Sequence, residues 1–433
     1  MAAHMKWKQE LQAFCNANMA QVQRLTHELC AIPAPTGSEG RRAQFCLSYL
    51  RGHGAQAYLD EAGNVVFPYA CEDGGKVVVM AAHMDTVFPE ETPLGVREEG
   101  DKAFCPGIGD DTANLAVLLV LAAWFAQHAP RTEQGIVFVC NVCEEGLGNL
   151  KGTRALMRQW AARTVAFLSL DCTCEAVFHR AVGSKRYRVT AHTEGGHSFS
   201  AFGNTNAIEV IARLVQDIYA LPVPQHAGST TTYNVGLIEG GTSVNAIAQQ
   251  ASCVCEFRSD DEACMAQMER SFETLFARAR ARCLSLEVEL LGTRPAGKNV
   301  PAGAQAALTE VCVQAVEQAF GTKPQLASAS TDCNIPLSMG IPSACFGCLV
   351  GGFPKFLQKA NLFVPGHAGS VDHILPSGEG ASQQAVTLLH RVPGEHLQLT
   401  AGHAVSGPGG KALGLQKGLP VQLAVLGHES HHI

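Results

Sequence analysis

The strongest constraint on the fold is an alternation of short apolar runs with helical stretches in the first half of the chain. Residues 76–85, 135–145 and 165–172 are rich in Val, Ile, Leu and Phe, which is typical of strands buried on both faces. The stretches between them, at about 111–128 and 151–163, have the pattern of helices. This alternation predicts an α/β fold with a mostly parallel sheet flanked by helices.

The pattern changes after residue 184. Shorter runs follow, several with alternating apolar and polar residues, and two helical stretches at about 205–219 and 261–282 interrupt them. Strands and two helices in this order predict a small α+β layer of the ferredoxin-like type. We expect this layer to occupy residues 185–293, inserted between the two parts of one larger domain, 1–184 and 294–391.

The first pattern then resumes. It predicts a helix at 304–320, a short strand at 343–346 and a last helix at about 377–391. Residues 392–433 are rich in Gly and show little periodicity, so we leave this tail unassigned.

Composition and charge exclude several kinds of partner. The chain has 433 residues, of which 46% are hydrophobic and 16% charged, so it can bury a large core. Its formal net charge is −7 and no basic run is interleaved with aromatic residues, so we expect no nucleic-acid binding. The longest apolar run, residues 115–126, is shorter than the ~20 residues that span a bilayer, so we expect no membrane partner.

The termini and the cysteines favour a cytoplasmic location. The first residues are polar and amphipathic where a signal peptide would be apolar. The 17 Cys are odd in number and scattered through a chain too large for a disulfide scaffold. We interpret the pairs Cys140/Cys143 and Cys345/Cys348 as core thiols rather than zinc ligands. The first pair lies within a predicted strand, where residues three apart face opposite sides.

Charged and imidazole side chains stand where the three predicted strands end. The first strand ends at His83-Met84-Asp85, the second at Glu144-Glu145 and the third at Asp171, while Asp110-Asp111 precedes the buried helix. Ligands of open α/β sheets bind beyond the carboxyl ends of the strands, so these groups should share one edge. Neighbouring ionised carboxylates raise each other's pKa, a conflict that a pair of divalent cations would resolve.

The spacing suggests roles for four of these residues. His83 and Asp85 lie two apart on a strand and share a face, so the carboxylate would fix the tautomer of a ligating imidazole. Glu144 and Glu145 point opposite ways, so one could bind metal while the other faces the attacking water as general base.

Each residue taken singly also has a simpler structural interpretation. Asp110 or Asp111 could be a helix N-cap, the Glu pair a solvated turn, and Asp171 a loop cap. The combination favours the metal site, because under the simpler interpretations all these polar residues would have to occur at one sheet edge by chance.

An ordered series of motifs resembles the dinuclear zinc exopeptidases and aminoacylases, a family that includes tripeptide aminopeptidase (peptidase T), glutamate carboxypeptidase and acetylornithine deacetylase. The resemblance covers about residues 10–390. It rests on IPAPTGSEG, HMDTV, GIGDDTAN, CEEGLGNLKG, SLD, GGHSF, EGGTSVNAIA, FRSDDE, GTRPAG, STDCNIPLSMGIP and GHAGSVDHI. It is similar most of all to peptidase-T-like members.

The resemblance implies two zinc ions per subunit, with cobalt or manganese as substitutes. It assigns His83 and Asp171 to one zinc, Glu145 and His367 to the other, and Asp110 to the bridge, with Asp85 orienting His83 and Glu144 as general base. His373 is the alternative to His367, because the acid that the family shows four residues after its His is here Asp372, at five. The family also implies a cis peptide between Asp110 and Asp111.

For the inserted layer, the resemblance implies a lid that forms a homodimer through residues 185–293. His197 would reach the partner's active site, and Asn245 and Arg294 would bind substrate, with Arg258 as an alternative. The simpler interpretations are that Asn245 caps a turn and that Arg258 pairs with Asp260 or Asp261.

The implied function is metal-dependent hydrolysis of amide bonds in small peptides. Asp171 stands where aminopeptidases of the family often have Asp and deacylases often have Glu, which favours a di- or tripeptide aminopeptidase. The alternatives are an N-acyl amino acid deacylase or carboxypeptidase of the same family, and a silent homologue that binds peptide without hydrolysis.

Overall fold

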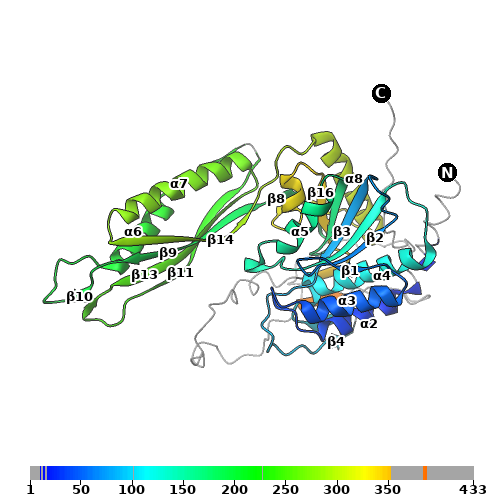
Figure 1. Ribbon diagram of the computed structural model, residues 1–433, viewed down its shortest axis with the longest axis horizontal. Coiled ribbons are helices and arrows are strands. Elements are labelled where there is room, and N and C mark those ends of the chain that lie inside the picture. The colour runs from blue at the N-terminus through cyan, green and yellow to red at the C-terminus, as the bar shows by residue number, and fades with distance from the viewer. Residues whose placement is uncertain are drawn as a thin grey trace, which may run out of the picture.

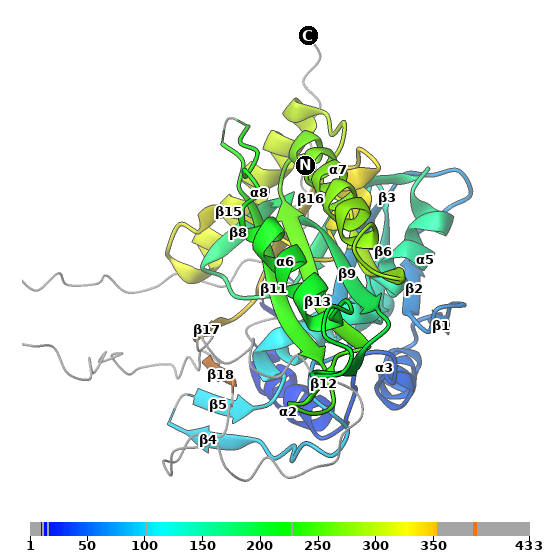
Figure 2. The same cartoon turned by 90° about the vertical axis from the view of Figure 1, so that its left-hand side faces the viewer.

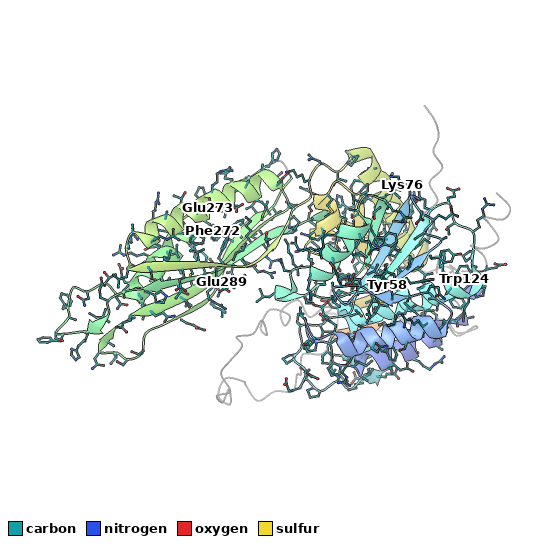
Figure 3. All side chains as sticks on the ribbon, in the orientation of Figure 1. Tyr58, Lys76, Trp124, Phe272, Glu273 and Glu289 are labelled. Atoms are coloured by element: carbon teal, nitrogen blue, oxygen red, sulfur yellow. The ribbon has the colours of Figure 1, made fainter. Side chains whose placement is uncertain are left out.

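The computed structural model describes residues 10, 13–14, 17–100, 102–226, 228–352 and 384–387. The molecule is elongated, with a larger domain built on a helix-covered sheet at one end and an inserted domain with a smaller sheet at the other (Figure 1). Trp124 and Phe272, labelled in Figure 3, are buried in the cores of the larger and the inserted domain respectively.

An eight-stranded sheet forms the centre of the larger domain. In spatial order its strands are β1 (Tyr58–Leu59), β2 (Val65–Tyr69), β6 (Gly135–Asn141), β3 (Val77–His83), β7 (Thr164–Leu170), β16 (Ser343–Phe346), β8 (Ala176–Ala181) and β15 (Gln325–Ala329). The central run β6, β3, β7 and β16 is parallel, as is the edge pair β8 and β15. The predicted α/β fold with a mostly parallel sheet is therefore confirmed.

Helices cover both faces of this sheet. Residues of α2 (Met19–Cys30), α3 (Gly40–Gly52), α4 (Ala113–His128) and α8 (Ala302–Phe320) share one core, and residues of α5 (Lys151–Trp160) and α9 (Asn334–Ser338) share the other. On β3, Val79 and Ala81 belong to the second core, whereas Met80 and Ala82 belong to the first. Burial of alternate residues on opposite faces explains why the central strands are apolar throughout.

Helix α4 is apolar on all sides because it is enclosed by the sheet and by α2 and α3. In the described part of the chain, the segment Ile108–His128 is long and apolar enough to cross a membrane, and 89% of its apolar window is buried within the protein.

The inserted domain contains a four-stranded antiparallel sheet with two helices. Its elements follow the order β9 (Gly183–His192), α6 (Ala207–Tyr219), β11 (Thr231–Gly240), β13 (Gln250–Ser259), α7 (Glu262–Arg280) and β14 (Ser285–Arg294). The spatial order is β11-β13-β9-β14, which is the ferredoxin-like arrangement. Alternate residues of β13 are buried against α6 and α7, which lie over one face of the sheet (Figure 2).

Two smaller sheets complete the described structure. β10 (Gly196–His197) pairs with β12 (Ala246–Ile247) in the inserted domain. β4 (Arg97–Glu99), β5 (Lys102–Cys105), β17 (Val350–Gly352) and β18 (Gln384–Thr387) form a sheet that contacts the segment Ile108–Thr112 through β18.

Strand β18 corrects one prediction. The helix expected at about 377–391 is wrong for residues 384–387, which pair antiparallel with β5 and β17. The β-branched Val386 and Thr387 suit a strand, and their partners on β5 are almost 300 positions earlier in the chain, by residue number. The unassigned tail, 392–433, lies outside the described residues.

Candidate active site

His83 is the last residue of β3 and is 1% exposed. Its Nδ1 lies 3.0 Å from the backbone oxygen of Asp85, and because a carbonyl only accepts, Nδ1 carries the proton. Its Nε2 lies 3.1 Å from Asp110 Oδ1 and 4.0 Å from Asp171 Oδ1. With the proton of the neutral form on Nδ1, Nε2 would face two carboxylates with its lone pair, an arrangement that needs a cation or a second proton between them.

The segment Ile108–Thr112 places the two aspartates differently. The peptide bond between Asp110 and Asp111 is cis, as the resemblance implies. Asp111 is fully buried and accepts hydrogen bonds from the His83 amide at 3.0 Å and from Asn114 Nδ2 at 2.8 Å. Asp110 instead faces His83 Nε2, so of the two aspartates it is the one that lies beside the proposed ligand atom of His83.

Glu144 and Glu145 follow β6, and side-chain oxygens hold their backbone. The amides of Glu144 and Glu145 donate to Oδ1 and Oδ2 of Asp85, each at 2.9 Å. The two preceding amides are held in the same way: Val142 donates to Asn64 Oδ1 at 3.0 Å and Cys143 to Glu39 Oε1 at 3.1 Å. Neither Asn64 nor Glu39 was predicted, although Glu39 lies inside the TGSEG motif.

Four of the predicted metal ligands converge at this edge. Ligand atoms of His83, Asp110 and Glu145 lie within 4.8 Å of one another, and so do those of His83, Asp111 and Asp171. Burial, followed by Asp110, raises the pKa of Asp171 to about 6, and burial, Asp110 and Glu144 raise the pKa of Glu145 well above its ordinary value. Carboxylates that resist ionisation together accept a cation readily, so the donor set fits the metal that the resemblance implies.

Glu144 is 95% buried and pairs with Arg294, the last residue of β14. Arg294 Nη1 donates to Glu144 Oε1 at 2.9 Å, and Nη2 donates to the backbone oxygen of Glu144. Burial raises the pKa of Glu144 to about 8, although Arg294 acts in the opposite direction. Arg294 was predicted to bind substrate. Here its Nη atoms contact Glu144, so the substrate contact stays a prediction.

Asp332 is a third residue that was not predicted from the sequence. It is fully buried and accepts hydrogen bonds from Asn141 Nδ2 at 2.6 Å and from Thr153 Oγ1. Asn141 precedes the loop that carries Glu144 and Thr153 follows it, so Asp332 holds both ends of that loop. The feature of the sequence that could have identified Asp332 is its position in the STDCN motif.

The remaining predicted residues lie away from His83 or outside the described chain. His197 lies on β10 and Asn245 directly precedes β12, and both are exposed; β10 is at the end of the inserted domain farthest from the larger one (Figure 1). Arg258 pairs with Glu256 at 2.8 and 3.0 Å, which corrects the simpler interpretation that it pairs with Asp260 or Asp261; its alternative role in substrate binding stays a prediction. His367 and His373 lie outside the described residues.

The cysteine pairs do not form the zinc sites that their spacing allows. Cys140 contacts Cys46, whereas Cys143 donates to Glu39 Oε1 at 3.4 Å. Cys345 contacts Cys172, and these two cysteines form a group of potential metal ligands with Asp171. All 16 cysteines among the described residues are free thiols.

Two proteins are similar to this chain in sequence over most of their length. A protein named as a LysW-lysine/LysW-ornithine hydrolase of Pyrobaculum aerophilum is 26% identical over 75% of this chain and 88% of its own. A protein named as the succinyl-diaminopimelate desuccinylase DapE of Mycobacterium tuberculosis is 25% identical, with the same coverage.

Solved structures show the same fold. Aminopeptidase PepT from Bacillus cereus has a TM-score of 0.61 and 20% identity over 86% of this chain and 94% of its own. A tripeptidase from Staphylococcus aureus has a TM-score of 0.60 and 20% identity over 76% of this chain and 90% of its own. The model of peptidase family M20/M25/M40 matches residues 79–361, well over half of the chain. The chain is therefore a member of peptidase family M20/M25/M40, a hydrolase whose fold and candidate site are those described above.

Proposed function

We propose that this protein is a metal-dependent exopeptidase that cleaves amide bonds in small peptides, acting as a di- or tripeptide aminopeptidase. The observation that carries the proposal is the cluster of His83, Asp110, Glu145 and Asp171 at one sheet edge with the buried Glu144 beside it. We propose two zinc ions, held by these four residues together with His367, and a cytoplasmic location.

When bound, the metal would polarise the scissile carbonyl and lower the pKa of the attacking water. Glu144 would take the proton from that water and pass it to the leaving amine. Arg294 favours the ionised carboxylate of Glu144, which is the form that accepts a proton. Asp85 keeps the proton of His83 on Nδ1, so that Nε2 is available as a ligand.

We propose that the protein acts as a homodimer through residues 185–293. His197 and Asn245 lie far from His83 within one chain, so they would complete an active site in a second copy. The surface around them is apolar, since Phe199 is 89% exposed and Phe202 is 90% exposed. Large exposed aromatic side chains of this kind favour an interface.

The second candidate function is removal of an acyl group from an amino acid. The names of the two relatives that cover 75% of the chain favour it, because one is named as a desuccinylase and the other as a hydrolase of LysW-linked lysine or ornithine. The chemistry at the metal would be the same, and only the groups that recognise the amino terminus would differ.

A library of di- and tripeptides, half with free and half with acylated amino termini, distinguishes these functions. The zinc-loaded protein is incubated with it and the products are read by mass spectrometry. We expect loss of the amino-terminal residue from free peptides. Cleavage of the acylated half alone would replace the aminopeptidase by a deacylase, and no cleavage in either half would favour the silent peptide-binding homologue.

A further inference from the structure

A second group of potential metal ligands adjoins the candidate active site. Sγ of Cys172, Sγ of Cys345 and a carboxylate oxygen of Asp171 all lie within 4.8 Å of one another. The two thiols also interact directly. Neither cysteine has a part in the proposed hydrolysis, whereas Asp171 is a proposed ligand of the catalytic metal.

The backbone holds this group in place from two neighbouring strands. β16 runs parallel to β7, and beyond the strands the Asp171 amide donates to Phe346 O at 3.2 Å and the Gly347 amide to Thr173 O at 3.2 Å. A Cβ on Gly347 would overlap the carbonyl oxygen of Cys172, so the two loops touch. The separation of the two thiols is therefore set by the sheet and not by a mobile loop.

The members of the group differ in burial. Cys345 is fully buried and Asp171 is 5% exposed, whereas Cys172, taken as a whole residue, is partly exposed. Two sulfurs and one oxygen suit soft cations, because thiolates select such ions over Mg²⁺ or Ca²⁺. Metal–sulfur bonds of about 2.3 Å, as in zinc sites, are compatible with ligand atoms at this separation.

We infer that Cys172, Cys345 and Asp171 form a binding site for one soft, thiol-seeking cation such as Cd²⁺. Binding releases the two thiol protons to solvent and leaves two metal–thiolate bonds. A cation here also draws on the carboxylate of Asp171, so it competes with the catalytic metal and inhibits the enzyme. That inhibition rests on the proposed function, whereas the binding itself does not.

The other thiol pairs found among the described residues lack a third ligand there. Cys30 contacts Cys105, Cys46 contacts Cys140 and Cys253 contacts Cys255. Among the residues that the structure describes, none of these three pairs belongs to a group of three potential ligands. The site next to Asp171 should therefore be the tightest of the four.

The test is a titration of the metal-free, full-length protein with Cd²⁺, followed by thiolate-to-cadmium charge-transfer absorption in the ultraviolet. Cys172→Gly removes one sulfur at a residue with φ of +66°, a conformation that glycine adopts freely. Cys345→Ala removes the other. Cys312→Ala, which deletes a buried thiol of α8, is the matched control. Carboxylate and imidazole sites give no thiolate band, so the absorption reports only the Cd²⁺ that is bound by thiols.

We expect C172G and C345A each to lose the thiolate absorption that appears at the lowest Cd²⁺ concentration and C312A to keep it. Unchanged absorption and Cd²⁺ stoichiometry in C172G would overturn the proposed site. If C345A does not fold, the result for C172G alone decides whether the site exists. In peptide hydrolysis, half-inhibition of C172G should need at least about tenfold more Cd²⁺ than wild type, and equal sensitivity would refute the competition for Asp171. Absence of hydrolysis in wild type would reject the proposed function and leave the absorption result standing.

Discussion

Asp85 connects the two parts of the candidate site. Its carboxylate lies 3.5 Å from His83 Nδ1 and accepts the amides of Glu144 and Glu145, and Thr36 Oγ1 donates to it at 2.9 Å. The hydrogen bonds lower the pKa of Asp85 although burial acts in the opposite direction. One ionised carboxylate thus orients a proposed ligand and fixes the loop that carries the proposed base.

Replacing Asp85 by Asn should therefore impair metal binding and turnover together. The amide nitrogen of Asn cannot accept a backbone N–H, so one of the two loop amides loses its acceptor. We expect metal affinity and kcat/KM to fall by about 10- to 100-fold, as is typical when the partner of a ligating His is changed. The measurements are zinc titration and peptide hydrolysis. Asp261→Asn in the inserted domain is the control, and equal effects of both substitutions would contradict the proposed role.

Glu144 should be needed for turnover and not for metal binding. Replacing it by Gln keeps its size and removes the proton acceptor, so we expect kcat to fall by about 10²- to 10⁴-fold with zinc stoichiometry unchanged. Glu256→Gln is the control, because Glu256 is also a glutamate paired with arginine, in its case Arg186 and Arg258, and lies in the inserted domain. Substantial residual turnover in E144Q would remove Glu144 from the base role.

At the scale of single elements, the sequence predicted the strands that are marked by a continuous apolar run. The apolar runs of β3, β6 and β7 identified the strands, and therefore the edge at which His83 and Asp171 meet. The residues that hold the site come from distant segments: Asp332 is 191 positions from its partner Asn141. Strand β18 was missed for the same reason, because its pairing with β5 leaves no periodicity in its own four residues.

Helix α7 offers a test of one such element. Asp261 is its N-cap and accepts the Cys264 amide at 2.9 Å, while His226 Nδ1 lies 2.9 Å from the other carboxylate oxygen. Asp261→Ala should destabilise the inserted domain by about 1 kcal/mol, the usual cost of losing a cap, and Asp261→Asn by less. Thermal unfolding of the three proteins at neutral pH measures this. Equal stability of wild type and D261A would contradict the capping role.

The same residue predicts a dependence on pH. The hydrogen bond with His226, followed by that from the Cys264 amide, lowers the pKa of Asp261 to about 2, below the value of about 3.9 in an unfolded chain. A lowered pKa contributes stability above the unfolded value and loses it as the pH falls through the folded value. The difference between wild type and D261A should therefore be constant above about pH 5 and shrink between about pH 4 and 2. A difference that grows on acidification would show that another group dominates.

At the scale of the whole molecule, the arrangement of the two domains decides how His197 could act. His83 lies at the C-terminal end of the central strand β3 of the larger sheet, and β10 lies at the far end of the inserted domain (Figure 1). If a second subunit completes the active site, mixing experiments should give a result that is not expected when one chain forms the whole site. Two inactive variants with defects in different domains should restore activity when their subunits are mixed.

Subunits of E144Q and H197A provide this test. In a hybrid dimer, the H197A subunit keeps Glu144 and receives His197 from its partner, so one of the two sites is complete. Random exchange makes about half of the dimers hybrid, so we expect about a quarter of the wild-type activity. E144Q mixed with D171N is the control, because both defects then lie in the larger domain and no hybrid site is complete. Light scattering checks that both mixtures are dimeric. If the E144Q and H197A mixture is then no more active than the control mixture, His197 does not act across the interface.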